Sequence, residues 1–435
     1  MRIIEDDRDY REFIKIIRDR SEDFGIDVLE DSKIIIEHVK KSGDFAVELY
    51  TNRYDRFQNN TFKVSQETIE EYAGKTERSF LDALSKSIER IRHFHEKQVE
   101  RSWKFKDALG VELGQIIRPL ERVGVYVPGG KAAYPSSVLM NVIPAQIAGV
   151  KEIALCVPFP DGQVNPYVMA AIKAVGVTEV YAIGGAQAIA AMAYGTQTIK
   201  KVDKIVGPGN AYVAAAKKMV FGTVDIDIIA GPSEILIAAD ETAEAAFVAA
   251  DLLSQAEHDE NASSILITTS KELVGKVQTE LTGRIEKLSR KEIVQNSLEN
   301  YGAIIMAADT TEMFDRVNEI APEHLEIMTK APEKDVELVK NAGAVFLGKW
   351  STEPLGDYSA GPNHVLPTNG TARFFSPLGV YDFIKRTSLI NFTEAGFKEI
   401  ASAVEAMAGY EGLDAHAEAV AVRKRELINF TDGEN

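Results

Sequence analysis

The sequence contains one cysteine among its 435 residues, and this scarcity already excludes a class of proteins. A single cysteine, Cys156, cannot form an intramolecular disulfide, which is typical of a protein from a reducing compartment. No apolar run approaches the roughly 18 residues that a membrane-spanning helix needs. The charged start of the chain also lacks the apolar core of a secretory signal. We therefore expect a cytoplasmic protein with no membrane partner.

The chain is also poor in basic charge, because 49 Lys and Arg face 66 Asp and Glu, a formal net charge of −17. This balance repels phosphate backbones, so we expect no nucleic-acid partner, whereas a small cationic ligand is well tolerated. With 31 Gly and 15 Pro the composition is neither collagen-like nor of low complexity. A length well beyond roughly 250–300 residues predicts more than one hydrophobic core.

The pattern of apolar residues predicts an α/β fold. Residues 1–120 are mostly helical in pattern, and from about residue 120 short apolar runs end in glycine and lead into helical segments. Strands that alternate with helices indicate βαβ units and a parallel sheet. The clearest strand or strand–helix segments are 123–130, 153–159, 180–195, 204–220, 263–268 and 303–309, and 310–320 is predicted to be a helix.

Two later stretches differ from this pattern. Residues 350–374 hold three prolines and three glycines, so we expect an ordered, functional loop without a regular element. After about residue 378 the chain is rich in Ala and Glu and is predicted to form a helical tail.

Four of the seven histidines stand beside acids, amides or glycines, whereas His38 and His95 extend apolar helix faces and are predicted to be structural. Gln255 and His258 are three residues apart at the end of a helical run, so one helix face carries both. On this pattern alone a surface pair at a helix end is the simpler interpretation, because Gln is a rare metal ligand, and a metal site is the alternative. The four histidines are His258, His324, His364 and His416.

Glu323 and His324 follow a proline that suits a first helical turn, and an acid beside an imidazole is a reasonable acid–base pair. The same pattern also fits an ordinary helix opening. Asp357 and His364 lie in the Gly/Pro loop, where a turn-capping acid and a solvated histidine are the simpler interpretation.

Glu411 and His416 flank a glycine turn that is predicted to start the last helix. Glycine turns at 129–130, 184–185 and 207–209 suit close approach of the backbone to a dinucleotide, but none completes GxGxxG, so the standard Rossmann fingerprint is absent. Cys156 in IALCVPF is predicted to be a buried strand residue rather than a nucleophile.

Together these segments resemble the histidinol dehydrogenase family over nearly the whole chain. The resemblance is carried by long strings, which are RVGVYVPGGKAAYPSSVLMNVIPAQIAGV (122–150), AIGGAQAIAAMAYGT (182–196), KIVGPGNAYVAAAK (204–217), AGPSEILIAAD (230–240), LLSQAEHD (252–259), APEHLEI (321–327), LGDYSAGPNHVLPTNGTARF (355–374), PLGVYDFIKRTS (377–388) and EGLDAH (411–416).

The resemblance implies two incomplete Rossmann-like parallel-sheet domains with a helical N-terminal arm and a helical C-terminal tail. The implied boundaries are 1–20 for the arm, 21–119 with 236–378 for a discontinuous domain with the metal and catalytic residues, 120–235 for the NAD domain and 379–435 for the tail. It also implies a homodimer in which the tail of one subunit completes the site of its partner.

The implied activity is the two-step oxidation of L-histidinol through L-histidinaldehyde to L-histidine, the last step of histidine biosynthesis, with two NAD and one bound zinc per subunit. The implied residues are the catalytic pair Glu323 and His324; the zinc ligands Gln255, His258, Asp357 and His416; the further substrate contacts Ser233, His364 and Glu411; and the NAD contacts Tyr126, Gln187 and Asn210. The four zinc ligands are also implied to bind the substrate through the metal, and His324 is implied to bind it directly.

The chemistry of the residues agrees with that assignment. Two imidazoles, a carboxylate and an amide oxygen suit a borderline-soft zinc ion, and the amine and imidazole of histidinol would add two nitrogen ligands. Three alternatives remain at this point: a relative that oxidises another polar alcohol, a zinc hydrolase in which Glu323 activates water, and a non-catalytic binding protein. The acidic Glu411 disfavours an anionic alcohol, and the absence of an HExxH motif disfavours a hydrolase.

Overall fold

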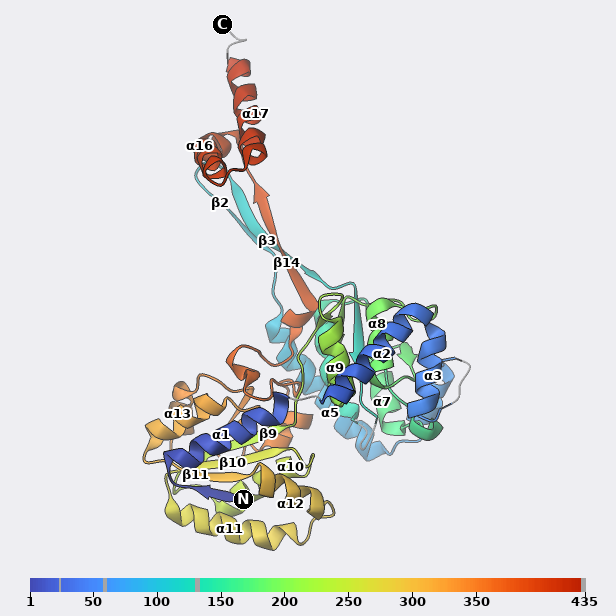
Figure 1. The fold of residues 1–435 in the computed structure, drawn as a ribbon, viewed down its shortest axis with the longest axis vertical. Helices are drawn as coiled ribbons and strands as arrows, with labels where there is room; N and C mark the ends of the chain where they lie inside the picture. The colour runs from blue at the N-terminus through green and yellow to red at the C-terminus, as the bar shows by residue number, and fades with distance from the viewer. Residues whose placement is uncertain (23–24, 58–60, 130–133, 432–435) are drawn as a thin grey trace. The chain divides into compact units, whose positions relative to one another are not determined.

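A computed structural model describes residues 1–22, 25–57, 61–129 and 134–431 of the chain (Figure 1). The chain forms two compact units, unit 1 with Met1–Val99 and Leu120–Phe383, and unit 2 with Glu100–Pro119 and Ile384–Asn435. Among the described residues no helix is both long and apolar enough for a membrane span.

Unit 1 contains two parallel sheets, as the alternation of strands and helices predicts. Sheet A has six strands in the order β1-β11-β10-β9-β12-β13, and sheet B has five in the order β6-β5-β4-β7-β8. The strands of sheet A are β1 (Arg2–Ile4), β9 (Glu234–Ala239), β10 (Ser263–Thr268), β11 (Ala303–Met306), β12 (His324–Met328) and β13 (Ala344–Leu347). Those of sheet B are β4 (Arg122–Tyr126), β5 (Glu152–Cys156), β6 (Glu179–Tyr181), β7 (Lys204–Val206) and β8 (Asp225–Ile226).

Helices cover both faces of sheet A, because alternate residues of its strands point to opposite sides. In β9, Leu236 packs in the hydrophobic core on one face of the sheet, and Ile235 and Ile237 pack in the core on the other face. Figure 1 shows α1 and α13 on one side of the sheet and α11 and α12 on the other. The helices are α1 (Asp7–Glu22) and α13 (Thr310–Ile320) on the first face, and α10 (Ala245–Ala256), α11 (Lys271–Ile285) and α12 (Lys291–Asn300) on the second.

Sheet B is sandwiched in the same way. Val125 of β4 belongs to the hydrophobic core on one face of the sheet, and Cys156 of β5 belongs to the core on the other face. One core is built with α4 (Gln66–Ala73), α5 (Arg78–His95), α6 (Pro135–Ala148) and α7 (Pro166–Val175), and the other with α2 (Ile26–Ser42), α3 (Asp44–Tyr54), α8 (Gly185–Tyr194) and α9 (Ala211–Val220). We call sheet A with its helices the A half and sheet B with its helices the B half.

This packing corrects the expected grouping of segments. Residues 26–95 belong to the cores of the B half, although we expected 21–119 to join 236–378. The N-terminal segment is not a separate arm, since β1 pairs with β11 and α1 packs in the core of sheet A. An amphipathic helix shows which of its faces is buried but not which sheet it covers, so the sequence pattern could not reveal that residues 26–95 pack on sheet B.

Unit 2 is built from segments that are distant in the sequence. Strand β3 (Glu112–Pro119) lies between β14 (Ile384–Asn391) and β2 (Trp103–Lys106) in an antiparallel sheet. Helices α16 (Glu394–Tyr410) and α17 (Asp414–Thr431) follow β14 and pack together. The expected tail 379–435 therefore begins with a 3₁₀ turn (Val380–Phe383) that belongs to unit 1, and strand β14 precedes its two helices. Unit 2 also takes in residues 100–119.

The remaining elements are short. They are α14 (Pro332–Asp335), α15 (Glu353–Tyr358) and the 3₁₀ turns η1 (Glu96–Gln98), η2 (Pro160–Gly162), η3 (Val336–Leu338), η4 (Thr371–Arg373) and η5 (Val380–Phe383). α15 lies inside the stretch that we expected to be irregular, because a proline in its first turn is compatible with a helix start.

Candidate functional site

The acid–base candidates lie at the amino end of a central strand of sheet A. Strand β12 begins at His324, pairs with β9 and β13, and is buried along its whole length. Glu323 directly precedes it. We expected a helix start here, and the structure shows a strand instead, since a short apolar run between two other parallel strands is buried on both faces.

The backbone of a single residue, Glu234, orients both candidates. The backbone N–H of Glu234, the first residue of β9, donates to Oε2 of Glu323 at 2.9 Å. Its carbonyl oxygen lies 2.9 Å from Nδ1 of His324, and only a protonated Nδ1 can donate to it. His324 therefore carries its proton on Nδ1, which leaves Nε2 as a bare acceptor.

Burial sets the charge of both groups. It lowers the pKa of His324, so that the imidazole is neutral near pH 7. It raises the pKa of Glu323 well above the ordinary carboxyl value, and the nearby carboxylates of Glu234, Asp357 and Glu353 act in the same direction. A neutral imidazole next to an acid whose pKa is raised is an arrangement that can accept and return protons.

Further acids converge on the imidazole from α15. Nε2 of His324 lies 3.6 Å from Oε1 of Glu353, and ligand atoms of His324, Glu353 and Asp357 lie within 4.8 Å of one another. Burial raises the pKa of Glu353 to about 9, with Asp357 as the next cause. Such a group of an imidazole and two carboxyls can hold a divalent cation.

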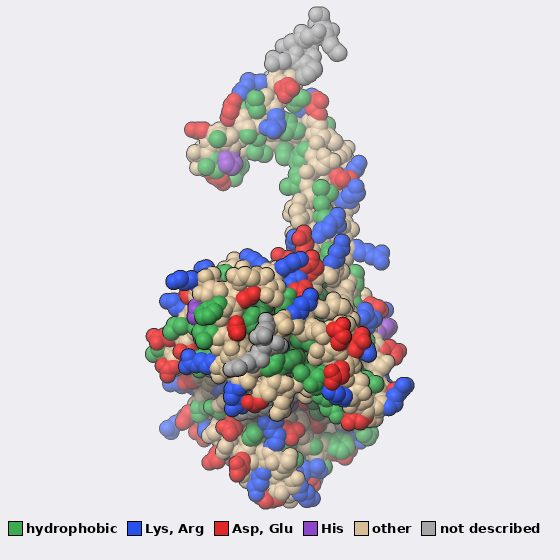
Figure 2. Space-filling view, turned by 90° about the vertical axis from the view of Figure 1, so that its right-hand side faces the viewer, with side chains coloured by type: hydrophobic (Ala, Val, Ile, Leu, Met, Phe, Trp, Pro, Cys, Tyr) green, Lys and Arg blue, Asp and Glu red, His purple; other side chains and the backbone are tan. Residues whose placement is uncertain are grey.

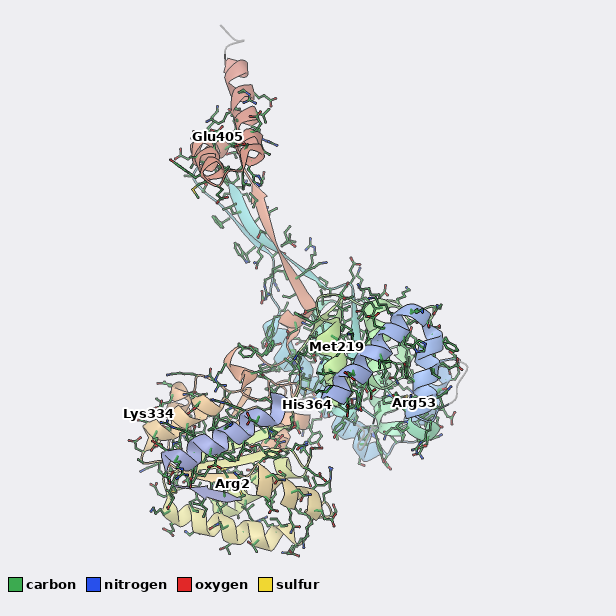
Figure 3. All side chains as sticks on the ribbon, viewed as in Figure 1. Arg2, Arg53, Met219, Lys334, His364 and Glu405 are labelled. Atoms are coloured by element: carbon green, nitrogen blue, oxygen red, sulfur yellow. The ribbon has the colours of Figure 1, made fainter. Side chains whose placement is uncertain are left out.

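His258, a predicted zinc ligand, and His364, a predicted substrate contact, lie near this group. His258 and His364 both act electrostatically on the His324 ring, and Nδ1 of His364 lies 4.0 Å from Oδ1 of Asp357. Figure 3 labels His364 on the segment that follows α15. Gln255, in the last turn of α10, is fully buried, and neither atom of its amide has a hydrogen-bond partner. An orphaned buried amide costs free energy unless a ligand satisfies it, so the donor set fits a metal ion.

Of the remaining predicted metal ligands and substrate contacts, two belong to unit 2 and one adjoins Glu234 in unit 1. Glu411 and His416 are exposed and stand before and within the start of α17. The glycine turn and helix start that we predicted there are confirmed. Ser233 is half-buried and directly precedes Glu234.

The B half brings the predicted NAD residues to the carboxyl ends of its strands. Tyr126 ends β4, and its hydroxyl accepts a hydrogen bond of 3.1 Å from the backbone N–H of Gly185 at the start of α8. Gln187, in the first turn of α8, is 1% exposed, and both atoms of its amide lack a partner. A helix N-terminus with an unpaired buried amide beside it fits a phosphate-bearing ligand. Gly130 of the first expected turn lies outside the described residues.

The glycine turn after β7 is held by the buried ion pair of Asp227 and Lys217. Oδ2 of Asp227 accepts from the N–H of Gly207 at 2.7 Å, and Nζ of Lys217 donates to the carbonyl of Gly207 at 3.0 Å. Gly207 has φ +114°, and a Cβ there would lie 2.0 Å from the carbonyl oxygen of Tyr126. The side chain of Asn210 caps α9 by accepting from Val213 N–H at 3.1 Å. The turn thus has one fixed shape in front of a helix N-terminus.

Three buried acids that the sequence did not single out support the site. The backbone N–H of Glu353 donates to Glu326 at 2.7 Å, and Thr352 donates to Asp251 at 2.7 Å. Burial raises the pKa of both Glu326 and Asp251. Glu326 shares the face of β12 with His324, and Glu353 stands four residues before Asp357, so strand and helix spacing carried a signal for both.

Cys156 is fully buried, as predicted, and burial raises the pKa of its thiol to about 12. A thiol that stays protonated at neutral pH is a poor nucleophile, so this residue does not compete with the cluster around His324.

Comparison with known proteins agrees with this geometry. The family model described as "Histidinol dehydrogenase" matches residues 18–424. Proteins named histidinol dehydrogenase from Listeria monocytogenes and Aquifex aeolicus are both 54% identical to this chain, over 92% and 91% of its length and 94% and 92% of theirs. A crystal structure titled as histidinol dehydrogenase from Elizabethkingia anophelis matches with a TM-score of 0.93 and 36% identity, and covers 98% of both chains. Matches of this extent leave one assignment: the chain belongs to the histidinol dehydrogenase family.

Proposed function

We propose that this protein oxidises L-histidinol through L-histidinaldehyde to L-histidine, the last step of histidine biosynthesis, with NAD as the oxidant and one zinc ion per subunit. The observation that carries the proposal is a buried neutral imidazole, His324, next to an acid of raised pKa and close to the carboxyl groups of Glu353 and Asp357, where the proposed zinc ligand Asp357 could share a cation. The relatives that share about half of its residues carry the name of this activity.

His324 is the base for the alcohol. Because Nδ1 donates to the Glu234 carbonyl, Nε2 is free to accept the hydroxyl proton as the carbinol carbon is oxidised. The lowered pKa keeps this acceptor neutral near pH 7. The chemistry that NAD supplies, when bound, is acceptance of a hydride from that carbon.

Glu323 serves the second oxidation. The aldehyde must add a water molecule before it can be oxidised again, and Glu323 in its ionised form, which the hydrogen bond from the Glu234 N–H favours, is placed next to His324 to take a proton from that water. As water adds, the protonated His324 returns the proton of the alcohol to the aldehyde oxygen, so that the neutral imidazole can accept the hydroxyl proton of the hydrate. Overall, L-histidinol, one water and two NAD⁺ yield L-histidine as the carboxylate, two NADH and three protons.

Zinc would be held by Gln255, His258, Asp357 and His416, and it would supply two positions for the amine and imidazole nitrogens of the substrate. Ser233, His364 and Glu411 would contact the substrate. Tyr126, Gln187 and Asn210 would contact NAD, supported by the unpaired Gln187 amide and the fixed turn before Asn210.

The active assembly is a homodimer in which Glu411 and His416 complete the site of the partner subunit. This is supported by the surface of unit 2, where Figure 2 shows many hydrophobic side chains and Tyr410 is 92% exposed. Exposed apolar side chains in such number mark an interaction surface. They include Trp103, Phe105, Ile390, Phe392, Val404, Met407, Tyr410 and Leu413.

The stoichiometry of the reaction tests the function. Incubation of limiting L-histidinol with excess NAD and the zinc-loaded protein should yield two NADH per substrate, measured by absorbance at the end point. A yield of one would contradict the double oxidation, and no NADH would contradict the assigned substrate.

A mixing experiment tests the shared site. A Glu323→Gln subunit and a His416→Asn subunit are each expected to be inactive, and their mixed dimer should recover activity because one site then has both residues. No recovery in verified mixed dimers would place each site within one chain.

A further inference from the structure

The geometry of the catalytic pair depends on one backbone position. The backbone of Glu234 contacts Glu323 through its N–H and His324 through its carbonyl, each at 2.9 Å. Neither contact involves the side chain of residue 234. Whatever fixes the first residue of β9 therefore also fixes both proton-transfer groups.

The side chain of Glu234 is anchored by an arginine from the first helix. Nη2 of Arg20 lies 2.5 Å from Oε1 of Glu234, and the side chains of the two residues are only 1% and 6% exposed. The same guanidinium donates to the carbonyl of Asn261 at 2.8 Å and to Oδ1 of Asn369 at 3.3 Å. The planar fork of arginine thus ties α1, the start of β9 and two loops together.

A buried ion pair of this kind is weak evidence for a contribution to stability, because desolvation of both charges offsets their attraction. Its geometry suits a positional role. The anchored residue is the one whose backbone N–H and carbonyl hold Glu323 and His324. The loop residue Asn369 sits against Gly231, three residues before Glu234, where an added Cβ would lie 1.7 Å from Nδ2 of Asn369.

We propose that Arg20 is a positioning residue for the reaction, which acts through Glu234 to hold Glu323 and His324 in register. The inference rests on the proposed function only in that these two residues move the protons. Arg20 donates to Glu234, Asn261 and Asn369, none of which is a proposed ligand of the substrate or the metal, so its loss should affect the chemical step more than binding.

The test compares Arg20→Met with Arg18→Met in the zinc-loaded protein. Arg18 is on the same helix, but its side chain is 56% exposed and lies 3.5 Å from Glu319 at the surface. Small displacements of catalytic groups are costly, so we expect kcat to fall about tenfold to a hundredfold in Arg20→Met. KM for L-histidinol and zinc content should stay within about twofold, and Arg18→Met should match the wild type.

A second measurement needs no turnover. With ring-¹⁵N histidine, the His324 signal, assigned by its absence in His324→Gln, should show a proton fixed on Nδ1 in the wild type and in Arg18→Met. It should lose this fixed tautomer in Arg20→Met. If the wild type makes no NADH from L-histidinol, the proposed function fails, while this spectrum still tests the role of Arg20.

If Arg20→Met does not fold, Arg20→Lys carries the test. It keeps the charge, but one ammonium cannot reproduce the planar fork, so a smaller drop in kcat at unchanged KM is expected. The proposal is overturned if kcat of the folded Arg20 variant stays within twofold of Arg18→Met, or if the His324 tautomer is unchanged.

Discussion

The two halves of unit 1 have the same architecture but place their polar groups at opposite ends of their strands. In the A half, buried titratable residues gather at the amino ends of β9 and β12, with Glu323 and His324 as the centre. In the B half, glycine turns and amides follow the carboxyl ends of β4, β6 and β7. On the proposed function, the same architecture would support two kinds of site, one that moves protons and one that holds a ligand with its backbone.

The largest effect should come from the proton-transfer residue of the A half. His324→Gln removes the base but keeps a polar side chain of similar size, so kcat should fall about 10²–10⁴-fold. The affinity for NADH, measured by fluorescence titration, should stay within about twofold, because the B half is untouched.

His93→Gln is the matched control, since His93 is an exposed histidine of α5. A joint loss of turnover and NADH affinity in His324→Gln, absent in the control, would mean that proton transfer and NADH binding are not separate functions of the A half and the B half.

A smaller effect, on NADH affinity instead of proton transfer, should come from a substitution in the B half. Gln187→Met replaces a buried amide that has no protein partner with an apolar side chain of similar size, so the free energy of unfolding should rise by about 1 kcal/mol. NADH affinity should fall about tenfold, the value of one lost hydrogen bond in a buried site. Both quantities come from urea unfolding and fluorescence titration.

Gln163→Met, at an exposed position, is the control for that substitution. Unchanged NADH affinity in Gln187→Met, or an equal change in the control, would remove Gln187 from the cofactor site.

The smallest effect concerns a buried histidine that serves only the fold. His95 is fully buried in the B half, Nδ1 lies 2.8 Å from the Ile91 carbonyl, and burial lowers its pKa from 6.5. Since the unfolded chain binds the proton more readily, the contribution of His95 to stability is present above pH 6.5 and is lost as the pH falls toward the lowered value. The loss is at most about 1.4 kcal/mol per pH unit.

Urea unfolding of the wild type and His95→Gln between pH 7 and pH 5 measures this difference, with His93→Gln on the exposed side of the same helix as control. The stability advantage of the wild type over His95→Gln should shrink as the pH falls. If it stays constant or grows, the histidine is not held neutral by burial.

The contrast between the halves also explains what the sequence could predict. In the B half each glycine turn directly follows its strand, so local patterns located the strands that hold Tyr126 and the turns before Gln187 and Asn210. In the A half the site is assembled from α10, β9, β12 and α15, and only the family resemblance related Gln255 and His258 to Asp357.

What local patterns missed was set by packing over long distances in the sequence. Glu323 and His324 were expected at a helix start, because Pro322 suits that position and nothing local reveals the neighbouring strands β9 and β13. Arg20 and Glu234 are 214 residues apart, and no pattern relates them. The helices of residues 26–95 showed their apolar faces but not the sheet that they cover.

Anomalous diffraction at the zinc edge, from crystals grown with zinc and L-histidinol, would test most directly whether zinc and substrate bind in the A half and not in the B half. The predicted result is one strong peak in each subunit within bonding distance of the Gln255 amide, the His258 ring and the Asp357 carboxylate, with the alcohol carbon facing Nε2 of His324. A fully occupied zinc position away from these three side chains, or substrate density among the glycine turns of the B half, would contradict it.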